Sequence, residues 1–481
     1  MEKLIYEYSQ SGKEGVALPQ GFESSVSPAE LIPAELLRQS ELQLPEVSEP
    51  EVVRHFTNLS TMNHHVDKDL YPLGSCTMKY NPKVNDRSAG FSGLANCHPL
   101  QDVGTVQGAL QIIYELERYL CEITGLQAAT LQPAAGSHGE LTGVLLMKKY
   151  FDQKGENRQF ILIPDSAHGT NPASAASANY KTISLKSNQR GCIDLEDLRA
   201  RMNPSVAGLM LTNPNTLGLF EEEVGEINEI VHNQGGLVYM DGANLNALLG
   251  IVRPGDMGFD ITHINLHKTF ATPHGGGGPG SGAIAVNEKL VEFLPVPRIE
   301  KNGDRFSLNY SYPRTIGKVL GFYGNFGVIV RAYCYIRMMG TKGLQAVSRN
   351  AILNANYLRQ KLSSVFKIPY NRTCMHEFVA SGERQFQCSG VKTLDIAKRL
   401  LDFGFHSPTV YFPLIVKEAL MIEPTETESK ETLDRFIETL VKIDQEATNE
   451  PEKLRNAPWT TPVRRLDELK ANKELNICWG K

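Results

Sequence analysis

The stretch ITHINLHKTFATPHGGGGPG, residues 261–280, joins an apolar strand to a lysine and then to a glycine-rich loop. The apolar run Ile261–Leu266 predicts a strand, and Lys268 follows its end. A lysine that forms a Schiff base must be able to lose its charge, which suits a strand end beside a ligand-binding loop. Glycines in that loop allow the backbone to approach a ligand without a clash from Cβ. Considered alone, however, Lys268 is far more typical of a surface lysine before a flexible turn.

The same loop contains the pattern G-x-G-x-x-G at Gly275, Gly277 and Gly280. In a dinucleotide-binding fold this pattern opens a helix. Here it leads into Gly282–Val286, whose apolar residues predict a strand. The sequence therefore argues against a dinucleotide site at this loop.

The strand before Lys268 belongs to a regular alternation of strands and helices. Further strand-like runs are Phe160–Ile163, Gly208–Leu211, Leu237–Met240 and Gly282–Val286. Helical spacing occurs at Gln107–Ile123, Gly139–Tyr150 and Val224–His232. This alternation predicts an α/β domain with a mainly parallel sheet. Such sheets bind ligands at the carboxyl ends of their strands.

We expect the chain to divide into five parts. These are an N-terminal arm and polar loop region (1–100), a large cofactor-binding domain (101–315), a connecting helix (316–340), a small α+β domain (341–450) and a C-terminal tail (451–481). Within the first part, residues 54–86 are polar and turn-rich, which is typical of a long functional loop. The connecting helix is expected within Gly317–Met339.

Composition argues against several classes of protein. The chain has 481 residues, of which 41% are hydrophobic and 21% charged, and a net charge of −5 without a basic block that would suit nucleic acid. No apolar run is long enough to span a bilayer, and the polar start lacks the core of a secretory signal. The eight cysteines form no C-x-x-C pair, which fits reduced thiols. We therefore expect a cytoplasmic protein without a nucleic-acid or membrane partner.

A second apolar strand ends in LVYMDGAN, residues 237–244, which places Asp241 27 positions before Lys268. Pyridoxal phosphate (PLP) needs a carboxylate against its pyridine nitrogen, because the protonated ring is the better electron sink. The small residues Gly242 and Ala243 would let the flat ring pack closely. An aspartate that caps a helix is an equally good interpretation of Asp241 alone.

A phosphate-binding element is predicted in PAAGSHGE, residues 133–140. Ser137 and Glu140 have the S-x-x-E spacing of a capping box. The small residues before them would leave backbone N–H groups exposed at a helix N-terminus, where phosphate binds well. An ordinary capped helix would show the same pattern.

Two further polar stretches follow strand ends. In PDSAHGTNP, residues 164–172, His168 is a candidate to stack on a cofactor ring, and the alternative is a loop histidine that bonds the backbone. In TNPNT, residues 212–216, the short polar side chains favour a turn over a contact with the cofactor.

Three other features are weaker. The histidines and aspartates within residues 64–69 resemble a metal cluster but lack a defining spacing, so a solvated loop is favoured. His376 and Glu377 lack the second histidine of H-E-x-x-H. Arg314 is a candidate for an anion contact, and a surface salt bridge explains it equally well.

A phosphate loop, a histidine, a D-x-A strand end and a lysine, in this order, describe the fold-type I PLP enzymes. The chain also resembles, over nearly its whole length, the glycine dehydrogenase (decarboxylating) family, the P-protein of the glycine cleavage system. The motifs include LYPLGSCTMKYNPK (70–83), PAAGSHGELTG (133–143), PDSAHGTNPAS (164–174), YMDGANLNA (239–247), NLHKTFATPHGGGGPGSG (265–282), MHEFVA (375–380) and FHSPTVYFPLIVKEALMIEPTETESKETLD (405–434). The family has a single-chain form and a split form. The length of this chain and its lysine indicate subunit 2 of the split form.

The resemblance implies roles for the matching residues. Lys268 would hold PLP as a Schiff base, Asp241 would face the pyridine nitrogen, and His168 would stack on the ring, so these are the expected catalytic residues. Ala243 would pack against the ring. The expected phosphate contacts are Ala135, Gly136, Ser137 and His267. Asn265 stands where many fold-type I enzymes have a serine, and the resemblance retains this asparagine.

The resemblance also implies an activity and partners. The expected reaction is PLP-dependent decarboxylation of glycine, release of CO2, and transfer of the aminomethyl group to the lipoyl arm of H-protein, an oxidoreductase reaction with a disulfide acceptor. Implied partners are P-protein subunit 1 and lipoylated H-protein, in a heterotetramer of two copies of each subunit. Residues 61–83 are the candidate lining of a lipoyl channel. Two alternatives stay open, namely another PLP-dependent decarboxylase or carbon–carbon lyase, and a non-catalytic partner subunit.

Overall fold

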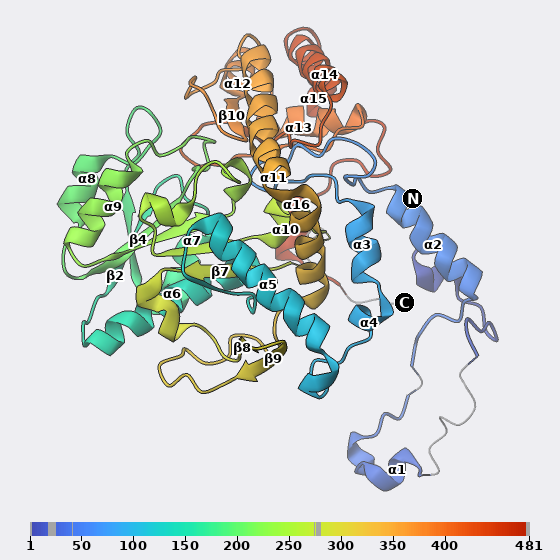
Figure 1. Cartoon of the computed structure of the whole chain (residues 1–481). Helices are drawn as coiled ribbons and strands as arrows, with labels where there is room; N and C mark the ends of the chain where they lie inside the picture. The colour runs from blue at the N-terminus through green and yellow to red at the C-terminus, as the bar shows by residue number, and fades with distance from the viewer. Residues whose placement is uncertain (1, 18–25, 41, 274, 276–279, 478–481) are drawn as a thin grey trace. The chain divides into compact units, whose positions relative to one another are not determined.

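The computed structural model describes residues 2–17, 26–40, 42–273, 275 and 280–477 (Figure 1). The chain forms two compact units, one of Met1–His65 with Thr460–Lys481 and one of Val66–Trp459. Gly277, in the middle of the G-x-G-x-x-G pattern, lies outside the described residues. No helix in the described ranges is long and apolar enough to cross a membrane, and the described cysteines are all free thiols.

The first unit consists of irregular chain and short helices. The helices are η1 Ile5–Tyr8, α1 Pro28–Leu31, η2 Ala34–Leu36, α2 Glu49–Thr61 and α16 Glu468–Lys473. The stretch 54–86, expected to be a loop, therefore begins inside α2. This helix starts where the Ser48 N–H donates to the Glu51 carboxylate over 2.9 Å. The capping signal lies before residue 54, which is why the polar stretch alone does not reveal the helix.

The second unit is built on a seven-stranded sheet of order β1-β7-β6-β5-β4-β2-β3. The strands are β1 Ala128–Thr130, β2 Phe160–Pro164, β3 Lys181–Leu185, β4 Val206–Thr212, β5 Leu237–Gly242, β6 Ile261–Ile264 and β7 Ala283–Val286. All neighbouring pairs from β3 to β6 are parallel, and only β7 runs antiparallel to β6 and β1. The expected mainly parallel sheet is confirmed. Strands β4 and β5 are buried along their whole length, which explains their unbroken apolar character.

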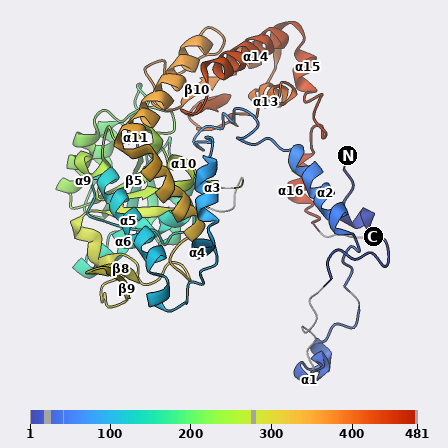
Figure 2. The same cartoon turned by 45° about the vertical axis from the view of Figure 1, so that its right-hand side comes forward.

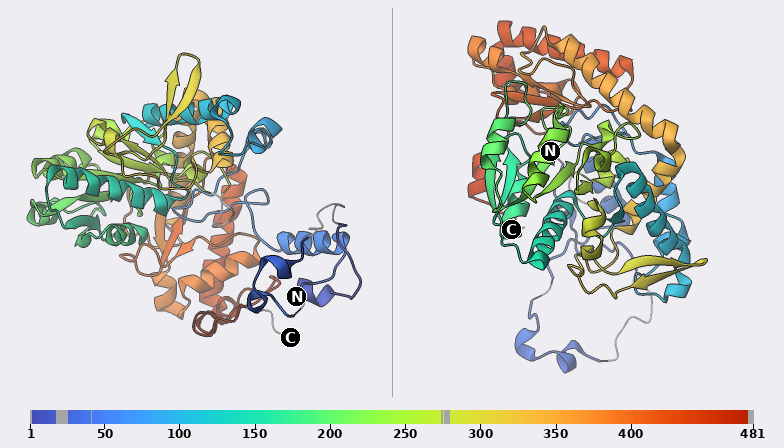
Figure 3. Two further views of the ribbon diagram at one scale, coloured as in Figure 1. Left: turned by 90° about the horizontal axis from the view of Figure 1, so that it is seen from below. Right: turned by 60° about the vertical axis from the view of Figure 1, so that its left-hand side comes forward.

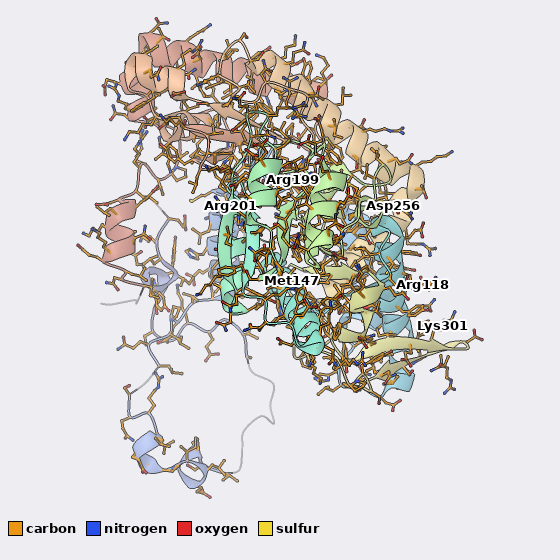
Figure 4. The ribbon with its side chains drawn as sticks, turned by 90° about the vertical axis from the view of Figure 1, so that its left-hand side faces the viewer. Arg118, Met147, Arg199, Arg201, Asp256 and Lys301 are labelled. Carbon is orange, nitrogen blue, oxygen red and sulfur yellow. The ribbon has the colours of Figure 1, made fainter. Side chains whose placement is uncertain are left out.

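Helices cover both faces of this sheet. They are α5 Gln107–Thr124, α6 Gly136–Lys154, α7 Thr170–Ser177, α8 Leu195–Arg201 and α9 Val224–Asn233. Alternate residues of β4 enter two separate apolar clusters, because successive side chains of a strand point to opposite faces. Met147 of α6 lies in one cluster, whereas Arg118 on α5 and Arg199 on α8 are exposed on the other side (Figure 4).

The connection to the small domain differs from the expected one. After the sheet the chain forms a projecting hairpin of β8 Arg298–Asn302 and β9 Arg305–Asn309 (Figure 3). The helix expected over Gly317–Met339 begins only at Phe326 and continues as α11 to Leu362, with a break at Gly340. A continuous helix cannot run through Gly324, because its φ of 112° is not helical. Gly324 also lies so close to Leu131 that a Cβ would be 2.3 Å from the Leu131 carbonyl oxygen. Helix α11 packs against α5 and reaches α14 of the small domain (Figure 2).

The small domain combines three strands with four helices around its own core. The elements are β10 Phe378–Ser381, α12 Glu383–Ser389, α13 Thr393–Asp402, β11 Thr409–Val410, β12 Ala419–Ile422, α14 Lys430–Asn449 and α15 Pro451–Arg455. The antiparallel order is β10-β12-β11, with Phe378 opposite Ile422. The remaining short helices of this unit are α3 Lys83–Ala89, α4 Ser92–Ala95, η3 Val103–Thr105, η4 Leu245–Ala247, η5 Pro254–Met257, α10 Leu266–Thr269 and η6 Glu288–Phe293.

Residues 66–82 connect the two domains of this unit. Leu73 forms a β-bridge with Ile422 of β12, and Gly74 lies so close that a Cβ would meet Met421 Cγ at 2.2 Å. Farther along, the buried Lys79 amine donates to Glu426 over 2.8 Å and to Asn246 over 2.7 Å. The segment is therefore anchored to the small sheet at one end and to a buried ion pair at the other.

Replacing Lys79 with methionine should lower the free energy of unfolding by about 3–5 kcal/mol, because the Glu426 carboxylate would stay buried without its cation. The matched control is Lys83→Met. Its ion pair with Asp67 is exposed, so its loss should cost less than about 1 kcal/mol. Urea denaturation of the two variants measures the difference. Equal losses of unfolding free energy in the two variants would contradict a stabilising role of the buried pair.

Candidate active site

Strands β4, β5 and β6 end at one edge of the sheet, and the residues just beyond them surround a cavity of about 260 Å³. A cavity at this edge is the usual ligand position in parallel sheets. Predicted residues that line it are Gly136, Ser137, His168, Asp241, Ala243, His267 and Lys268. Ala135 immediately precedes α6 as its N-cap. The sequence motifs thus meet in one place, although they span more than 130 positions of the chain.

Asp241 is the penultimate residue of β5 and is only 3% exposed. Its carboxylate accepts the Ala243 N–H over 3.0 Å and the Asn171 amide over 3.1 Å, and His263 Nε2 lies 3.4 Å away. Burial opposes ionisation, but His263 and these two donors together hold the pKa of Asp241 below its ordinary value. Gly242 is required here because a Cβ would lie 2.1 Å from the His263 carbonyl oxygen. The cavity therefore has an ionised carboxylate in its wall.

His263 is itself held in place by the sheet. The Tyr239 hydroxyl lies 2.7 Å from Nδ1, and Asn265 Oδ1 lies 2.8 Å from Nε2. Burial raises the pKa of Tyr239 well above its ordinary value, so the phenol beside Nδ1 keeps its proton. The Nε2 atom of His263 lies between Asn265 and Asp241. None of the sequence motifs predicted this hydrogen-bond network around His263.

The capping box predicted from Ser137 and Glu140 is wrong. Helix α6 begins at Gly136, so Ser137 lies inside its first turn and does not cap it. Glu140 turns toward the cavity and accepts hydrogen bonds from Thr170 Oγ1 over 2.7 Å and from Asn171 over 3.0 Å. Burial and the nearby charge of Asp241 raise the pKa of Glu140. Burial and the neighbouring charge of Asp241 therefore disfavour ionisation of Glu140.

The N-terminus of α6 opens onto the opposite end of the cavity. The helix has 19 residues, and its first N–H groups form a site for an anion. Gly136 is needed because a Cβ would lie 2.5 Å from Asn265 Nδ2. The same Nδ2 lies 3.2 Å from His267 Nε2, and the Ser281 N–H lies 3.2 Å from His267 Nδ1. These groups fit a phosphate.

Lys268 lies in the short helix α10. The preceding strand ends at Ile264, two residues earlier than expected, because Leu266 already belongs to the helix. The Lys268 amine donates to the Ser75 carbonyl oxygen over 2.7 Å. Ser75 and Thr77 both adopt left-handed backbone conformations, with φ 59° and 47°, which cost about 1–3 kcal/mol each for residues other than glycine.

The position of His168 is compatible with both interpretations, a histidine that bonds the loop backbone and one that faces a cofactor. Its Nδ1 accepts the Thr170 N–H over 3.2 Å, as a loop histidine would, and its ring also lines the cavity. The ring contacts the edge of Phe412, with 5.7 Å between the ring centroids. Stacking on a cofactor remains a prediction.

In the polar stretch 212–216, some side chains stabilise the turn and others line the cavity. Asn215 builds the turn by accepting the Leu217 N–H over 3.0 Å. Thr212 and Thr216 line the cavity instead. Thr212 Oγ1 is buried and has no hydrogen-bond partner among the described residues, which suggests that a ligand supplies one.

PLP fits the groups around this cavity. They comprise a lysine amine, an ionised carboxylate, a helix N-terminus suited to phosphate and an unpartnered hydroxyl. Among the described lining residues the basic side chains include His267 and Lys268, and the backbone N–H groups at the start of α6 would add to the phosphate binding. No other predicted residue is needed for this fit.

Three weaker expectations lie elsewhere. Arg314 forms a surface salt bridge with Glu292 at 2.8 Å and does not line the cavity. In the stretch 64–69, which resembles a metal cluster, Asp67 pairs with Lys83 and Asp69 with Arg435, which supports the favoured solvated loop. His376 and Glu377 are fully buried beside the segment that carries Ser75.

Sequence reasoning missed Ser75, Glu377 and Glu423 as parts of the site. Glu377 and Glu423 each accept hydrogen bonds from the segment that contacts Lys268. The sequence does contain a local signal for the two glutamates. Glu377 directly precedes the apolar run FVA, and Glu423 directly follows ALMI, so each places a charge at the end of a buried strand.

Comparisons with known proteins identify the family of this chain. A family model described as glycine cleavage system P-protein matches residues 21–304, and one described as glycine dehydrogenase, C-terminal domain, matches residues 347–459. A probable glycine dehydrogenase (decarboxylating) subunit 2 from Chloroherpeton thalassium is 60% identical over 480 residues, covering 99% of this chain and 97% of that protein. The corresponding protein from Chlorobaculum tepidum is 59% identical over 482 residues, covering 99% of both chains.

Solved structures establish the fold. A glycine decarboxylase (P-protein) of the glycine cleavage system, in inhibitor-bound form, superposes with a TM-score of 0.74 at 22% identity, covering 87% of this chain and 95% of that one. A cysteine desulfurase from Thermococcus onnurineus reaches a TM-score of 0.61 at 15% identity, covering 79% and 95%. The expected fold-type I architecture with a smaller C-terminal domain is confirmed. On the family models and the full-length relatives, the chain belongs to the glycine dehydrogenase (decarboxylating) family, the P-proteins of the glycine cleavage system.

Proposed function

We propose that this chain is the PLP-bearing subunit of a glycine-decarboxylating enzyme that passes the aminomethyl group to the lipoyl arm of H-protein. The observation that carries the proposal is the meeting of Lys268 and the ionised Asp241 at neighbouring strand ends around one cavity. The relatives are named for glycine decarboxylation, and their near-complete match supports the same substrate here. Another PLP-dependent decarboxylase or lyase would share both residues, but the full-length match does not favour it.

When bound, PLP supplies an aldehyde for the amine of Lys268 and a ring that accepts electrons from a bond of the substrate. Asp241 would hold the proton of the ring nitrogen, since its carboxylate is ionised and fixed by Ala243 and Asn171. The α6 N-terminus would orient the phosphate. His168 would pack against the ring from the cavity wall, as predicted from its motif.

The remaining groups of the cavity would control protons and water. Lys268 would be guided to the Ser75 carbonyl oxygen whenever its amine is free. Glu140 would remain protonated beside Asp241, so that only one negative charge faces the ring. The modest volume of the cavity favours an amino acid without a side chain.

We further propose that the chain works with P-protein subunit 1 and lipoylated H-protein, in an assembly of two copies of each subunit. The names of the relatives as subunit 2 support a second subunit. Residues 61–83 remain our candidate for the lining of the lipoyl channel, and Ser75 within them lines the cavity.

Lys268→Ala should reduce the exchange of labelled CO2 into glycine on the order of 10³-fold or more, because no other amine replaces it. The assay uses the chain assembled with subunit 1 and H-protein. The visible absorbance that borohydride removes from the wild type should also be absent. Lys289→Ala, which changes an exposed lysine, is the control. Normal exchange by Lys268→Ala would refute the proposal.

Asp241→Asn should leave the lysine-linked cofactor in place and lower exchange by about 10²-fold, because the ring nitrogen loses its anionic partner. The lowered pKa of Asp241 means that its carboxylate stays ionised from about pH 5 upward. Wild-type activity should therefore show no acid limb from this group between about pH 5 and 8. An Asn variant with wild-type rates would assign Asp241 a structural role only.

Glycine-dependent CO2 release should require both subunits and H-protein. We expect the chain alone to release less than about 1% of the CO2 that the complete mixture releases, since catalysis depends on the assembled site. Full activity of the isolated chain on free amino acids would favour a different PLP-dependent decarboxylase. Absence of any cofactor absorbance in the assembled complex would favour a non-catalytic subunit.

A further inference from the structure

Two glutamates face each other at the end of the small sheet. Strands β10 and β12 pair in antiparallel register with Phe378 opposite Ile422. Glu377 directly precedes Phe378 and Glu423 directly follows Ile422, so the two acids are cross-strand neighbours one step farther along. Both side chains are fully buried. Two like charges at such a position, away from water, repel each other strongly.

These acids hold the segment that contacts Lys268. The Glu377 carboxylate accepts the Ser75 N–H over 2.6 Å and the Ser75 hydroxyl over 3.0 Å. The Glu423 carboxylate accepts the Thr77 N–H over 2.9 Å and the Thr77 hydroxyl over 2.5 Å. Each acid therefore stabilises one residue with a left-handed backbone, and the Ser75 carbonyl oxygen between them meets the Lys268 amine.

The charged groups around the pair can be counted. Lys79 and Glu426 neutralise each other at 2.8 Å. Two groups that also face the acids are neutral: burial, aided by Lys268, lowers the pKa of His376 to about 3, and burial raises the pKa of the Cys76 thiol to about 11. What remains is one ammonium, on Lys268, and two carboxylates.

If the two carboxylates retained one proton between them, their remaining negative charge would balance the charge of Lys268. Burial and the charge of Glu423 raise the pKa of Glu377 well above its ordinary value, and burial also raises the pKa of Glu423. His376 Nε2 lies 3.7 Å from Glu423 and 4.0 Å from Glu377, so it faces both acids. Neither ring nitrogen of His376 has a hydrogen-bond partner among the described residues.

We propose that Glu377 and Glu423 form one acid pair that retains a single proton, positions Ser75 and Thr77, and supplies the one negative charge that balances Lys268. They are positioning residues, since neither of them lines the cavity. The inference rests on the proposed role of Lys268. It adds a counter-charge to the lysine from the small domain.

The shared proton makes an unusual prediction for glutamine substitutions. In Glu377→Gln or Glu423→Gln, the remaining acid loses its partner and ionises, so the charge beside Lys268 stays at −1. Only the double variant removes that charge. Titrating the visible absorbance of the cofactor-loaded complex with subunit 1 gives a pH midpoint for the lysine-linked cation. Each single variant should move this midpoint by less than about 0.3 unit, and the double variant should lower it by about 1 unit or more.

The matched control is Glu221→Gln. Glu221 is also buried, and it accepts a backbone N–H, from Ile193, over 3.1 Å, but it belongs to the turn after β4. It should leave the midpoint unchanged even if it destabilises the fold. If each single variant lowers the midpoint by as much as half the effect of the double variant, the acids ionise independently and the proposal is wrong. An unchanged midpoint in the double variant would show that the two acids have no electrostatic effect on Lys268.

A second measurement does not need the cofactor. In the cofactor-free full-length chain, the rate at which Lys268 is acylated can be followed by mass spectrometry across pH. The double variant should shift this pH profile downward, whereas both single variants should follow the wild type. The infrared band of a protonated buried carboxyl should also disappear in each single variant, in a difference spectrum against wild type. Persistence of that band in both single variants would overturn the shared proton.

The two measurements separate this inference from the proposed function. If the wild-type complex carries no cofactor on Lys268, the proposed function fails, and the acylation series still decides whether the acid pair exists. If the cofactor is present and the midpoints do not follow the predicted order, the acid pair fails and the proposed function stands.

Discussion

The site depends on a buried charge at the end of the central strand β5. An ionised carboxylate without water is stable only when donors and cations surround it. Asp241 obtains them from three elements: the turn that follows it, Asn171 on α7, and His263 on β6. The parallel register of β5 and β6 places His263 directly opposite Asp241. The sheet is therefore the scaffold of the fold and also the reason that Asp241 can remain charged.

The position of the Lys268 amine also depends on residues 66–82, which join the two domains. Lys268 comes from the large domain, but its amine meets a carbonyl oxygen of Ser75, which is held by residues of the small sheet. The close approach of Gly74 to Met421 leaves no room for a side chain there. A change in the small domain would thus reach the lysine without touching the cavity. This explains why a strained backbone, with left-handed Ser75 and Thr77, is tolerated where hydrogen bonds to buried acids offset its cost.

Much of the large domain was predictable from the sequence, because β4 and β5 are buried on both faces and must be apolar throughout. Lys268 and Asp241 were predictable for the same reason, since each follows such a run. Glu140 was misassigned because S-x-x-E spacing looks the same whether the serine caps the helix or lies inside it. The late start of α11 depends on the contact of Gly324 with Leu131, and no local pattern encodes a contact across nearly 200 residues. The pairing of Ser75 with Glu377 spans an even longer separation.

The two acid pairs of the site follow from one physical constraint. Glu140 lies beside Asp241, and Glu377 lies opposite Glu423, and in a medium of low polarity the ionisation of one carboxylate disfavours that of its neighbour. In our proposal each pair presents one negative charge. The Asp241 pair directs its charge toward the place where a protonated ring nitrogen would bind, and the Glu377 pair directs its charge toward the lysine. Because the N–H groups at the start of α6 would contribute to phosphate binding, both negative charges remain available to the two cations of the bound cofactor. The four acids therefore match the charge distribution of PLP on a lysine, although none of them needs to touch the phosphate.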